Sequence, residues 1–492
     1  MEYSGKKVLV MGLGLHGGGL ETARFLLKRG ASLTVTDLRN EKILLPSIEQ
    51  LDAACAELGC ERVRYVLGKH EIEDFQKADM VIKNPGVKPD SPFLLAAKCI
   101  ETDISLFLSE SKVRLFAVTG SKGKSCTASA LHWILSGTEK SGKSFLGGNI
   151  TVSPLTFIDE LAENDNVVLE LSSWQLGDLK GRVAADGSPL LKPKAAILTA
   201  IMPDHLDRYA SMDEYVDDKR NIYRGQDESC VTIAGDDDWG RSFHAQTKGR
   251  PLVYSRNALG ETQNGGWIDS GGRGLALLRN RPHCKEDIEE LVPSRLRTPG
   301  DHQKLNLLAA SLAAYSLGLK AEDIRLAIAD FPGIEHRLEL FHESGGVRFY
   351  NDSAATIPQA AAACIDALSH AKQGPASQGP ASQDSAQGSL ILVTGGTDKK
   401  LDFTPLAKAA AKAKEIILLA GTGSDKLSSL LDEEGINYSG PFDDLDKAVI
   451  CAIKKAEEGC IVALSPGCAS FGMFLNEFDR GRKWKEAILK LT

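Results

Sequence analysis

The segment from Phe116 to Ser129 reads FAVTGSKGKSCTAS and has the residue types of a phosphate-binding loop. Its two glycines would let the backbone approach a phosphate, and the N-terminus of the following helix would present N–H groups to it. Lys124 would reach the β- and γ-phosphates, and Ser125 would offer its hydroxyl to Mg²⁺. The common G-x-x-x-x-G-K-[ST] loop needs glycine at position 118, where this chain has Val118. From this segment alone, a glycine turn capped by Ser125 is the alternative.

A second glycine-rich pattern, Gly12-x-Gly14-x-x-Gly17, follows an apolar run near the N-terminus and precedes a helical pattern. Asp37 lies about 20 residues beyond the last glycine, where an acid binds the ribose of NAD. Any nucleotide diphosphate can use the same turn and helix N-terminus. The pattern alone therefore leaves open a dehydrogenase, another nucleotide site, or a tight turn without a ligand.

Two further polar residues follow apolar runs that indicate strands, where an open parallel sheet places its ligand crevice. Glu170 lies in NVVLELSS, and His205 lies in PDHLD beside Asp204. A carboxylate and an imidazole at one sheet edge can hold a divalent cation near the loop of Lys124. A surface turn rich in aspartate is the competing interpretation.

Lys219 lies in SMDEYVDDKRNIY, where Ser211 and Glu214 have capping-box spacing and predict the start of a helix. Four residues lie three or four positions from Lys219 on the same helical face, namely Tyr215, Val216, Ile222 and Tyr223. A lysine on a buried stripe usually extends its amine to water. The other interpretation is a functional amine with a shifted pKa, or a modified side chain.

These residues lie on expected strands that alternate with helices, the pattern of parallel, doubly wound α/β sheets. The expected strands lie at 6–12, 32–37, 64–68 and 78–86, then at 114–120, 166–173 and 194–209 with its loop, then at 346–356, 389–396, 415–421 and 460–467. Residues 255–298 indicate turns and short strands. Residues 371–388, which contain GPASQ twice, indicate a flexible surface insertion. At about 150 residues per domain, we predict three domains, 1–108, 109–333 and 334–492.

Composition narrows the class of protein. The chain of 492 residues has a formal charge of -8 and no pronounced basic run, so we expect no nucleic-acid partner. It has no apolar span of about 20 residues and no signal peptide, so we expect no membrane insertion. Its cysteines are scattered without a C-x-x-C pair, which favours a reducing, cytoplasmic location.

Taken in order, nine motifs resemble those of the Mur ligases: TGSKGKS, ELSSWQL, DHLDRY, YVDDKRNIY, GDHQKLNLLAA, HRLE, NDSAAT, GGTDKKLDF and LSPGCASF. The family's loop is T-G-x-x-G-K-[ST], so Val118 is not a defect. The resemblance implies a Rossmann-like UDP-binding domain, a central P-loop ATPase-type domain and a C-terminal Rossmann-like domain. It is nearest to members that join D-glutamate to UDP-N-acetylmuramoyl-L-alanine for peptidoglycan precursor synthesis, with ATP and two Mg²⁺ ions, through an acyl phosphate shielded by domain closure. We expect a monomer.

The resemblance also implies site residues. Lys124, Glu170, His205 and Lys219 would be catalytic; Ser125 and Glu170 would hold one Mg²⁺, and His205 and a carbamylated Lys219 the other. The implied ATP contacts are Thr119, Gly120, Ser121, Lys122, Gly123, Lys124, Ser125, Asn306, Arg337 and Asp352. The implied contacts with the UDP-linked substrate are Leu15, His16, Asp37, Arg39, Gly86 and Asn149, and those with D-glutamate are Thr356, Lys399, Ser470 and Phe471. The glycine pattern near the N-terminus is then a UDP site rather than an NAD site.

Two departures from the family pattern bear on the amino acid that is added. Ala354 replaces the family's lysine in NDSKAT, for which Lys122 is a candidate replacement, and Glu477 stands where an aromatic residue is usual. A sister ligase adding another amino acid is one alternative. An NAD-dependent oxidoreductase built on Gly12 to Asp37 is a second, and a non-catalytic nucleotide-binding scaffold is a third.

Overall fold

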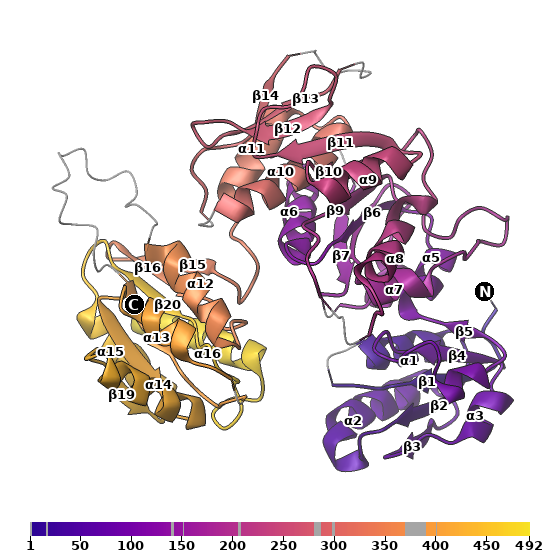
Figure 1. Cartoon of the computed structure of the whole chain (residues 1–492). Coiled ribbons are helices and arrows are strands. Elements are labelled where there is room, and N and C mark those ends of the chain that lie inside the picture. The colour runs from indigo at the N-terminus through magenta and orange to yellow at the C-terminus, as the bar shows by residue number, and fades with distance from the viewer. Residues whose placement is uncertain are drawn as a thin grey trace. The chain divides into compact units, whose positions relative to one another are not determined.

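The computed structural model describes residues 2–15, 18–138, 142–150, 152–204, 208–279, 287–297, 301–369, 390–399 and 401–492, with the backbone alone described at 301 and 302. His16, Gly17, His205 and the predicted insertion at 371–388 lie outside the described residues. The chain divides into two compact units (Figure 1). The first comprises Met1–Ser294 with Lys304–Ile328, and the second comprises Arg295–Gln303 with Ala329–Thr492. The division into three domains stays a prediction.

The first sheet has five parallel strands in the order β3-β2-β1-β4-β5. Its strands are β1 (Lys7–Met11), β2 (Ser32–Asp37), β3 (Arg64–Leu67), β4 (Met80–Lys83) and β5 (Ile100–Glu101). Its helices are α1 (Gly18–Lys28), α2 (Glu41–Leu58), α3 (Ile72–Lys77), α4 (Pro92–Leu95) and α5 (Asp103–Glu110). Parallel neighbours need crossover connections, which these helices supply.

The second sheet has nine strands in the order β14-β13-β12-β11-β10-β9-β6-β8-β7, parallel from β7 to β12 and antiparallel beyond. The strands are β6 (Arg114–Thr119), β7 (Ser144–Gly148), β8 (Asn166–Glu170), β9 (Ala195–Leu198), β10 (Val231–Gly235), β11 (Arg250–Ser255), β12 (Gly265–Ile268), β13 (Gly274–Leu277) and β14 (Glu289–Val292). Its helices are α6 (Lys124–Ser136), α7 (Ser173–Asp178), α8 (Met212–Arg224) and α9 (Asp238–Gln246), followed by α10 (Asp301–Ser316) and α11 (Ala321–Asp330). Short 3₁₀ turns η2 (Pro154–Thr156) and η3 (Ile158–Glu160) follow β7.

The third sheet has six strands in the order β15-β16-β20-β17-β18-β19, all parallel except β15. Its strands are β15 (Glu339–Ser344), β16 (Val347–Asn351), β17 (Leu390–Thr394), β18 (Glu415–Leu419), β19 (Ser439–Phe442) and β20 (Ile461–Leu464). Its helices are α12 (Pro358–Ser369), α13 (Thr404–Ala410), α14 (Thr422–Glu433), α15 (Leu445–Lys455) and α16 (Glu477–Leu491). In each sheet, candidate site residues follow the carboxyl ends of strands.

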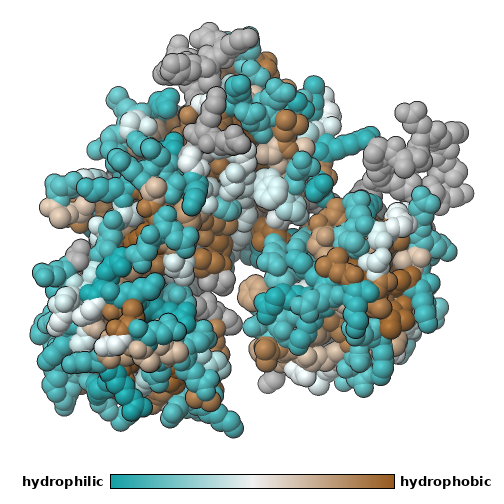
Figure 2. Space-filling model, turned by 180° about the vertical axis from the view of Figure 1, so that it is seen from behind, coloured by the Kyte–Doolittle hydropathy of each residue, from teal (hydrophilic) through white to brown (hydrophobic). Residues whose placement is uncertain are grey.

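The predicted α/β class is confirmed, and each strand expected from an apolar run is present. Six further strands were not predicted from the sequence, namely β5, β7, β10, β11, β15 and β19. One buried cluster runs from side chains around the first sheet, such as Leu26, to side chains around the second, such as Val167. On the face shown in Figure 2, hydrophilic side chains cover most of the surface and hydrophobic ones form separate patches. Among the helices in the described part of the chain, none is long and apolar enough to span a bilayer.

Candidate active site

The glycine loop between β6 and α6 requires both of its glycines. Gly120 has a φ of 146° and Gly123 a φ of 92°, values that favour glycine. A Cβ at position 120 would lie 1.9 Å from Thr199 Oγ1, and one at position 123 would lie 2.4 Å from Asn306 Oδ1. The loop therefore packs against the end of β9 on one side and against α10 on the other. Asn306, one of the predicted ATP contacts, lies against this loop.

Hydrogen bonds from the loop's first residues fix its shape. The Thr119 hydroxyl donates to Leu171 O at 2.7 Å, and the backbone N–H groups of Ser121 and Lys122 donate to Ala200 O at 2.8 and 3.3 Å. The Ser121 hydroxyl donates to Met202 O at 2.9 Å. These groups hold the loop to the ends of β8 and β9. The side chain of Lys122 is exposed.

Two lysine amines converge on the carbonyl of Gly120. Lys124 Nζ lies 3.0 Å from Gly120 O and Lys219 Nζ lies 2.9 Å from the same atom. Lys219 is 1% exposed, so its amine does not extend to water. Burial and the neighbouring positive charge of Lys124 lower the pKa of Lys219 to about 7, against the opposing charges of Asp204, Asp218 and Glu170. At neutral pH this amine is protonated in only part of the molecules.

Helix α8 begins where the capping residues predict a helix, and it carries Lys219 on its buried face. Ser211 caps the helix by accepting a hydrogen bond from Glu214 N at 3.2 Å. The Glu214 carboxylate accepts from Ala210 N at 3.0 Å rather than from the Ser211 backbone, so the predicted capping box is only half formed. The predicted stripe of Tyr215, Val216, Ile222 and Tyr223 is buried. The amine of Lys219 also lies 4.4 Å from the centre of the Tyr215 ring.

Glu170 ends β8, opposite Val118 of β6, and is 2% exposed. Its Oε1 accepts a hydrogen bond from Asn149 Nδ2 at 3.0 Å. Its Oε2 is buried and has no hydrogen-bond partner in the described part of the chain. Burial of a carboxylate oxygen without a partner raises the free energy of the folded protein unless a cation or a hydrogen-bond donor binds to it.

This donor set fits Mg²⁺, which prefers oxygen ligands and is usually held by one or two carboxylates together with substrate phosphates and water. Ser125 Oγ and Glu170 Oε2 are the oxygens that would hold one ion. Among the described residues, no group of three or more His, Cys, Asp or Glu side chains gathers to hold a metal. His205 lies outside the described residues, and Lys219 donates to Gly120 O. The second Mg²⁺ and the carbamate therefore stay predictions.

The glycine-rich turn after β1 is braced by Asp37 at the end of β2. Asp37 Oδ2 accepts from Gly14 N at 3.2 Å and Oδ1 accepts from Arg39 N at 2.9 Å. Gly19 was not predicted from the sequence; a Cβ there would lie 2.1 Å from Gly12 O, so glycine lets α1 start against the turn. Leu15 and Arg39 are exposed, and Gly86 donates its N–H to Asn84 Oδ1 at 3.0 Å.

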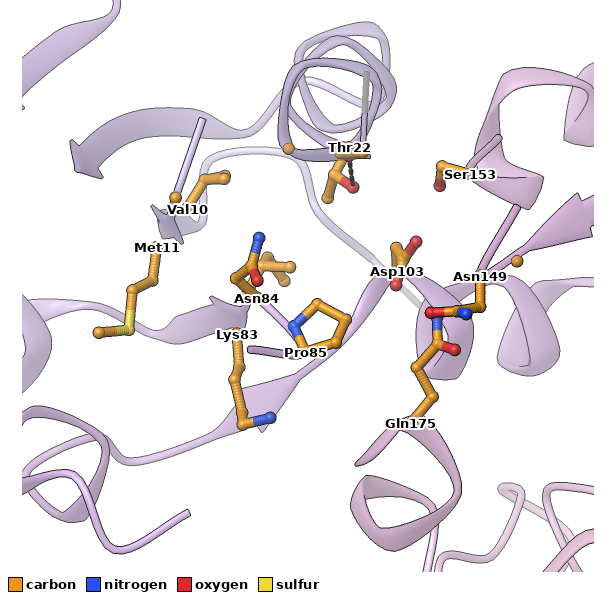
Figure 3. A pocket seen from close by; sticks show the side chains of 15 residues that line it. Val10, Met11, Thr22, Lys83, Asn84, Pro85, Asp103, Asn149, Ser153 and Gln175 are labelled. Atoms are coloured by element: carbon orange, nitrogen blue, oxygen red, sulfur yellow. Dashed lines mark hydrogen bonds between the residues drawn. The ribbon is translucent and has the colours of Figure 1, made fainter. Parts of the chain in front are cut away.

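A cavity of about 220 Å³ lies beside this turn (Figure 3). Val10, Met11, Asn84 and Pro85 of the first sheet lie on one side, Asn149, Ser153 and Gln175 on the other, and Asp103 between them (Figure 3). Asn149 thus belongs both to the cavity wall and to the hydrogen bond with Glu170. The cavity wall therefore includes Gly12 of the predicted UDP site and Asn149, which contacts the predicted metal ligand Glu170.

A buried ion pair beside this cavity was not predicted from the sequence. Lys83 Nζ lies 2.6 Å from Asp178 Oδ2, with side-chain exposures of 3% and 9%. The pair joins β4 of the first sheet to α7 beside the second. Lys83 could have been noticed in the sequence as a charged residue, in KNPG, at the end of an apolar strand. No comparable pattern marks Asp178 on α7 as its partner.

The second unit contains the other predicted residues. Thr356, Lys399, Ser470 and Phe471 lie on loops that follow β16, β17 and β20, adjacent strands of one sheet. Phe471 is 64% exposed, and Arg337 is exposed. Asp352 is buried, and its oxygens accept from Leu338 N at 3.0 Å and from Ser465 Oγ at 2.7 Å. The structure gives Asp352 a role inside its unit, and its contact with ATP stays a prediction.

The phosphate-type loop with two converging lysines belongs to the second sheet, and the nucleotide-type glycine turn belongs to the first. Two such loops in one chain are typical of a nucleotide-dependent enzyme. Three family models match the chain: Mur ligase MurD-like, N-terminal domain, over residues 6–105; Mur ligase middle domain, over 118–314; and Mur ligase, glutamate ligase domain, over 336–468. The chain belongs to the Mur ligase family.

Its relatives match it over nearly their whole length. The UDP-N-acetylmuramoylalanine--D-glutamate ligase of Treponema pallidum is 37% identical, over 98% of this chain and 97% of its own. The enzyme of the same name from Roseiflexus sp. is 36% identical over 100% of both chains, and that of Borreliella burgdorferi is 36% identical over 100% and 99%.

Solved structures share the fold at lower identity. The UDP-N-acetylmuramate-alanine ligase of Thermotoga maritima has a TM-score of 0.56 and 18% identity, covering 99% of this chain and 100% of its own. The MurF ligase of Thermotoga maritima, solved with ADP, has a TM-score of 0.52 and 16% identity over 99% and 95%. These similarities establish the shared fold.

Proposed function

We propose that this chain is an ATP-dependent ligase that joins D-glutamate to UDP-N-acetylmuramoyl-L-alanine by an amide bond, in the synthesis of peptidoglycan precursors. Support comes from the names of relatives that match it end to end. The structural observation that carries the proposal is the buried, unpartnered Glu170 Oε2 at the same sheet edge as a glycine loop with two converging lysines. An NAD-dependent reaction would leave all of these groups without a task.

The first chemical step would take place at the loop. The alanine carboxylate attacks the γ-phosphorus of ATP, and the bond between this phosphorus and the oxygen of the β-phosphate breaks. ADP departs, and the substrate carries an acyl phosphate. Lys124 and the N–H groups at the start of α6 would stabilise the negative charge on the transferred group, the main means of catalysis in phosphoryl transfer. Mg²⁺, held by Ser125 and Glu170, would neutralise phosphate charge when bound.

The UDP-linked substrate would lie along the cavity of Figure 3. Its diphosphate would meet the turn at Gly12 and the N-terminus of α1, since helix N-termini favour anions. Its alanine end would then point toward Asn149 and the metal site. Asn149 would hold Glu170 by one oxygen, so that the other faces the cation.

The second step would use the loops of the second unit. D-glutamate, bound by Thr356, Lys399, Ser470 and Phe471, attacks the acyl carbon with its amine, and the tetrahedral intermediate releases phosphate. Lys399 would pair with a carboxylate of the amino acid. Water would hydrolyse the acyl phosphate, so we propose closure of the units around it. The monomeric state stays a prediction.

The proposal is tested by phosphate release. The protein is incubated with ATP, Mg²⁺, UDP-N-acetylmuramoyl-L-alanine and one amino acid at a time. D-glutamate is expected to give sustained release, and omission of either substrate is expected to stop it. If another amino acid supports release while D-glutamate does not, the chain is a sister ligase. If no amino acid does, the nucleotide-binding scaffold is the better account.

A further inference from the structure

Arg480, on α16 of the second unit, is a buried cation that forms no ion pair with the described residues. It is 1% exposed, and burial lowers its pKa to about 10. Among the described residues, no carboxylate oxygen lies within 4.0 Å of its guanidinium. Buried arginines are normally paired with an acid. The hydrogen bonds of Arg480, rather than an ion pair, therefore account for its burial.

The guanidinium donates hydrogen bonds to two separate loops. Nε lies 3.0 Å from Ser353 Oγ and Nη2 lies 2.8 Å from Ser353 O, in the loop after β16. Nη1 lies 3.2 Å from Cys468 O, in the loop after β20. Ser353 Oγ donates in turn to Glu477 O at 2.7 Å, which ties the first loop to the start of α16. The rigid, planar group of arginine thus fixes both loops at once.

A third loop is attached to the second of these. Thr397 and Ala469 exchange backbone hydrogen bonds of 3.1 and 3.0 Å, and the Thr397 hydroxyl donates to Phe471 O. A Cβ at Gly396 would lie 3.8 Å from Arg480 Nη1, an ordinary contact distance. The loop after β17 therefore packs on the loop after β20, next to the guanidinium.

These are the three loops that carry Thr356, Lys399, Ser470 and Phe471. The strands before them are neighbours in the order β16-β20-β17, so the loops leave one edge of the sheet together. We propose that Arg480 is a positioning residue for the amino-acid site, because it holds the loops that bear the D-glutamate contacts in one arrangement. This inference rests on the proposed function. It also predicts that the UDP-linked substrate, whose residues lie in the first unit, does not depend on Arg480.

The test compares Michaelis constants for the two substrates in full-length variants. Arg480→Lys keeps the charge but places its three N–H donors on one nitrogen, so it cannot reach both loops as the planar guanidinium does. Ser353→Ala removes one acceptor of the guanidinium. Arg482→Lys is the matched control, since Arg482 lies two residues along the same helix with its side chain 56% exposed. A displaced site loop is costly for binding and alignment, so we expect KM for D-glutamate to rise about tenfold or more in Arg480→Lys and about threefold in Ser353→Ala. KM for the UDP-linked substrate is expected to change by less than about twofold.

The result that overturns the inference is an unchanged KM for D-glutamate in both variants, or an equal rise in KM for both substrates. If Arg480→Lys does not fold, as judged by circular dichroism, Ser353→Ala decides between these outcomes. If the unmodified protein releases no phosphate with D-glutamate, the proposed function fails first. The same comparison is then made with the amino acid that does support release.

Discussion

At the scale of single residues, the loop site contains two buried ionisable side chains, Lys219 and Glu170, that do not form an ion pair with each other. Lys219 donates to a backbone carbonyl, and Glu170 leaves one oxygen without a partner. The position of Lys219 on a buried helical face was predictable from the spacing of the apolar residues around it. The hydrogen bond between Asn149 and Glu170 was not predictable, because these residues lie 21 positions apart at the ends of neighbouring strands and meet only through the register of the sheet.

Lys219→Ala is expected to reduce kcat/KM by about 100-fold or more, since a group beside the phosphate loop would be lost. If Lys219 acts as a carbamate, added short carboxylic acids should restore part of the rate by replacing the missing oxygens. Rates are measured by phosphate release with and without acetate. Unchanged activity in Lys219→Ala would remove this residue from the mechanism.

Asn149→Ala is expected to weaken the affinity for Mg²⁺ rather than to abolish the reaction. The substitution frees Glu170 Oε1 and lets the carboxylate rotate, and loss of such a supporting contact typically lowers metal affinity about 10–100-fold. The Mg²⁺ concentration for half-maximal activity should rise correspondingly. A variant with the same Mg²⁺ requirement as the unmodified protein would show that the contact does not orient Glu170.

At the scale of elements, the apolar runs identify the central strands because those strands are buried on both faces. The strands that were missed have weaker patterns: β7 ends in two glycines, β11 contains Pro251, and β19 contains Pro441. Proline lacks a donor and glycine weakens a strand, so only the tertiary sheet stabilises these segments. The need for glycine at position 19 also depends on tertiary structure, because the start of α1 packs directly against the backbone of Gly12.

The loop between β6 and α6 gives a matched pair of glycine substitutions. Gly120→Ala would bring a Cβ within 1.9 Å of Thr199 Oγ1 at a φ of 146°, so we expect loss of ATP binding and a lower melting temperature. Gly137→Ala, after the last turn of α6, meets its nearest atom at 3.6 Å and has a φ of -81°. It should bind ATP normally. Equal ATP affinity in both variants, measured by calorimetry, would contradict the account of the loop.

The hydrogen bond between Asp352, after β16, and Ser465, after β20, leads us to expect that the stability of the second unit depends on pH. Burial raises the pKa of Asp352 from 3.8 to about 6, so the folded unit keeps a proton that the unfolded chain releases. This contribution to stability is complete below about pH 4 and is lost as pH rises through 6, a change of up to about 3 kcal/mol. Hydrogen exchange of β16 and β20, corrected for its intrinsic pH dependence, should show this loss. In Asp352→Asn the loss should be absent, and an unaltered pH dependence would exclude Asp352 as its source.

At the scale of the whole molecule, the predicted contacts are divided between the two units. The phosphate loop, Glu170, Lys219 and the cavity of Figure 3 belong to the first unit, and the predicted D-glutamate contacts belong to the second. The order of nine short motifs along the chain was enough to indicate the family, because the set is specific although each motif is short. The contacts of Arg480 could not be predicted, since they join loops more than a hundred residues apart.

The most direct test of the reaction follows the oxygen atoms of the substrate carboxylate. UDP-N-acetylmuramoyl-L-alanine labelled with ¹⁸O in its alanine carboxylate is incubated with the protein, ATP, Mg²⁺ and D-glutamate, and the released phosphate is analysed by mass spectrometry. If the carboxylate attacks the γ-phosphate and the amine then displaces phosphate, each phosphate carries one ¹⁸O from the substrate. Unlabelled phosphate accompanying amide formation would contradict an acyl phosphate, and phosphate released without any amide product would contradict the ligase itself.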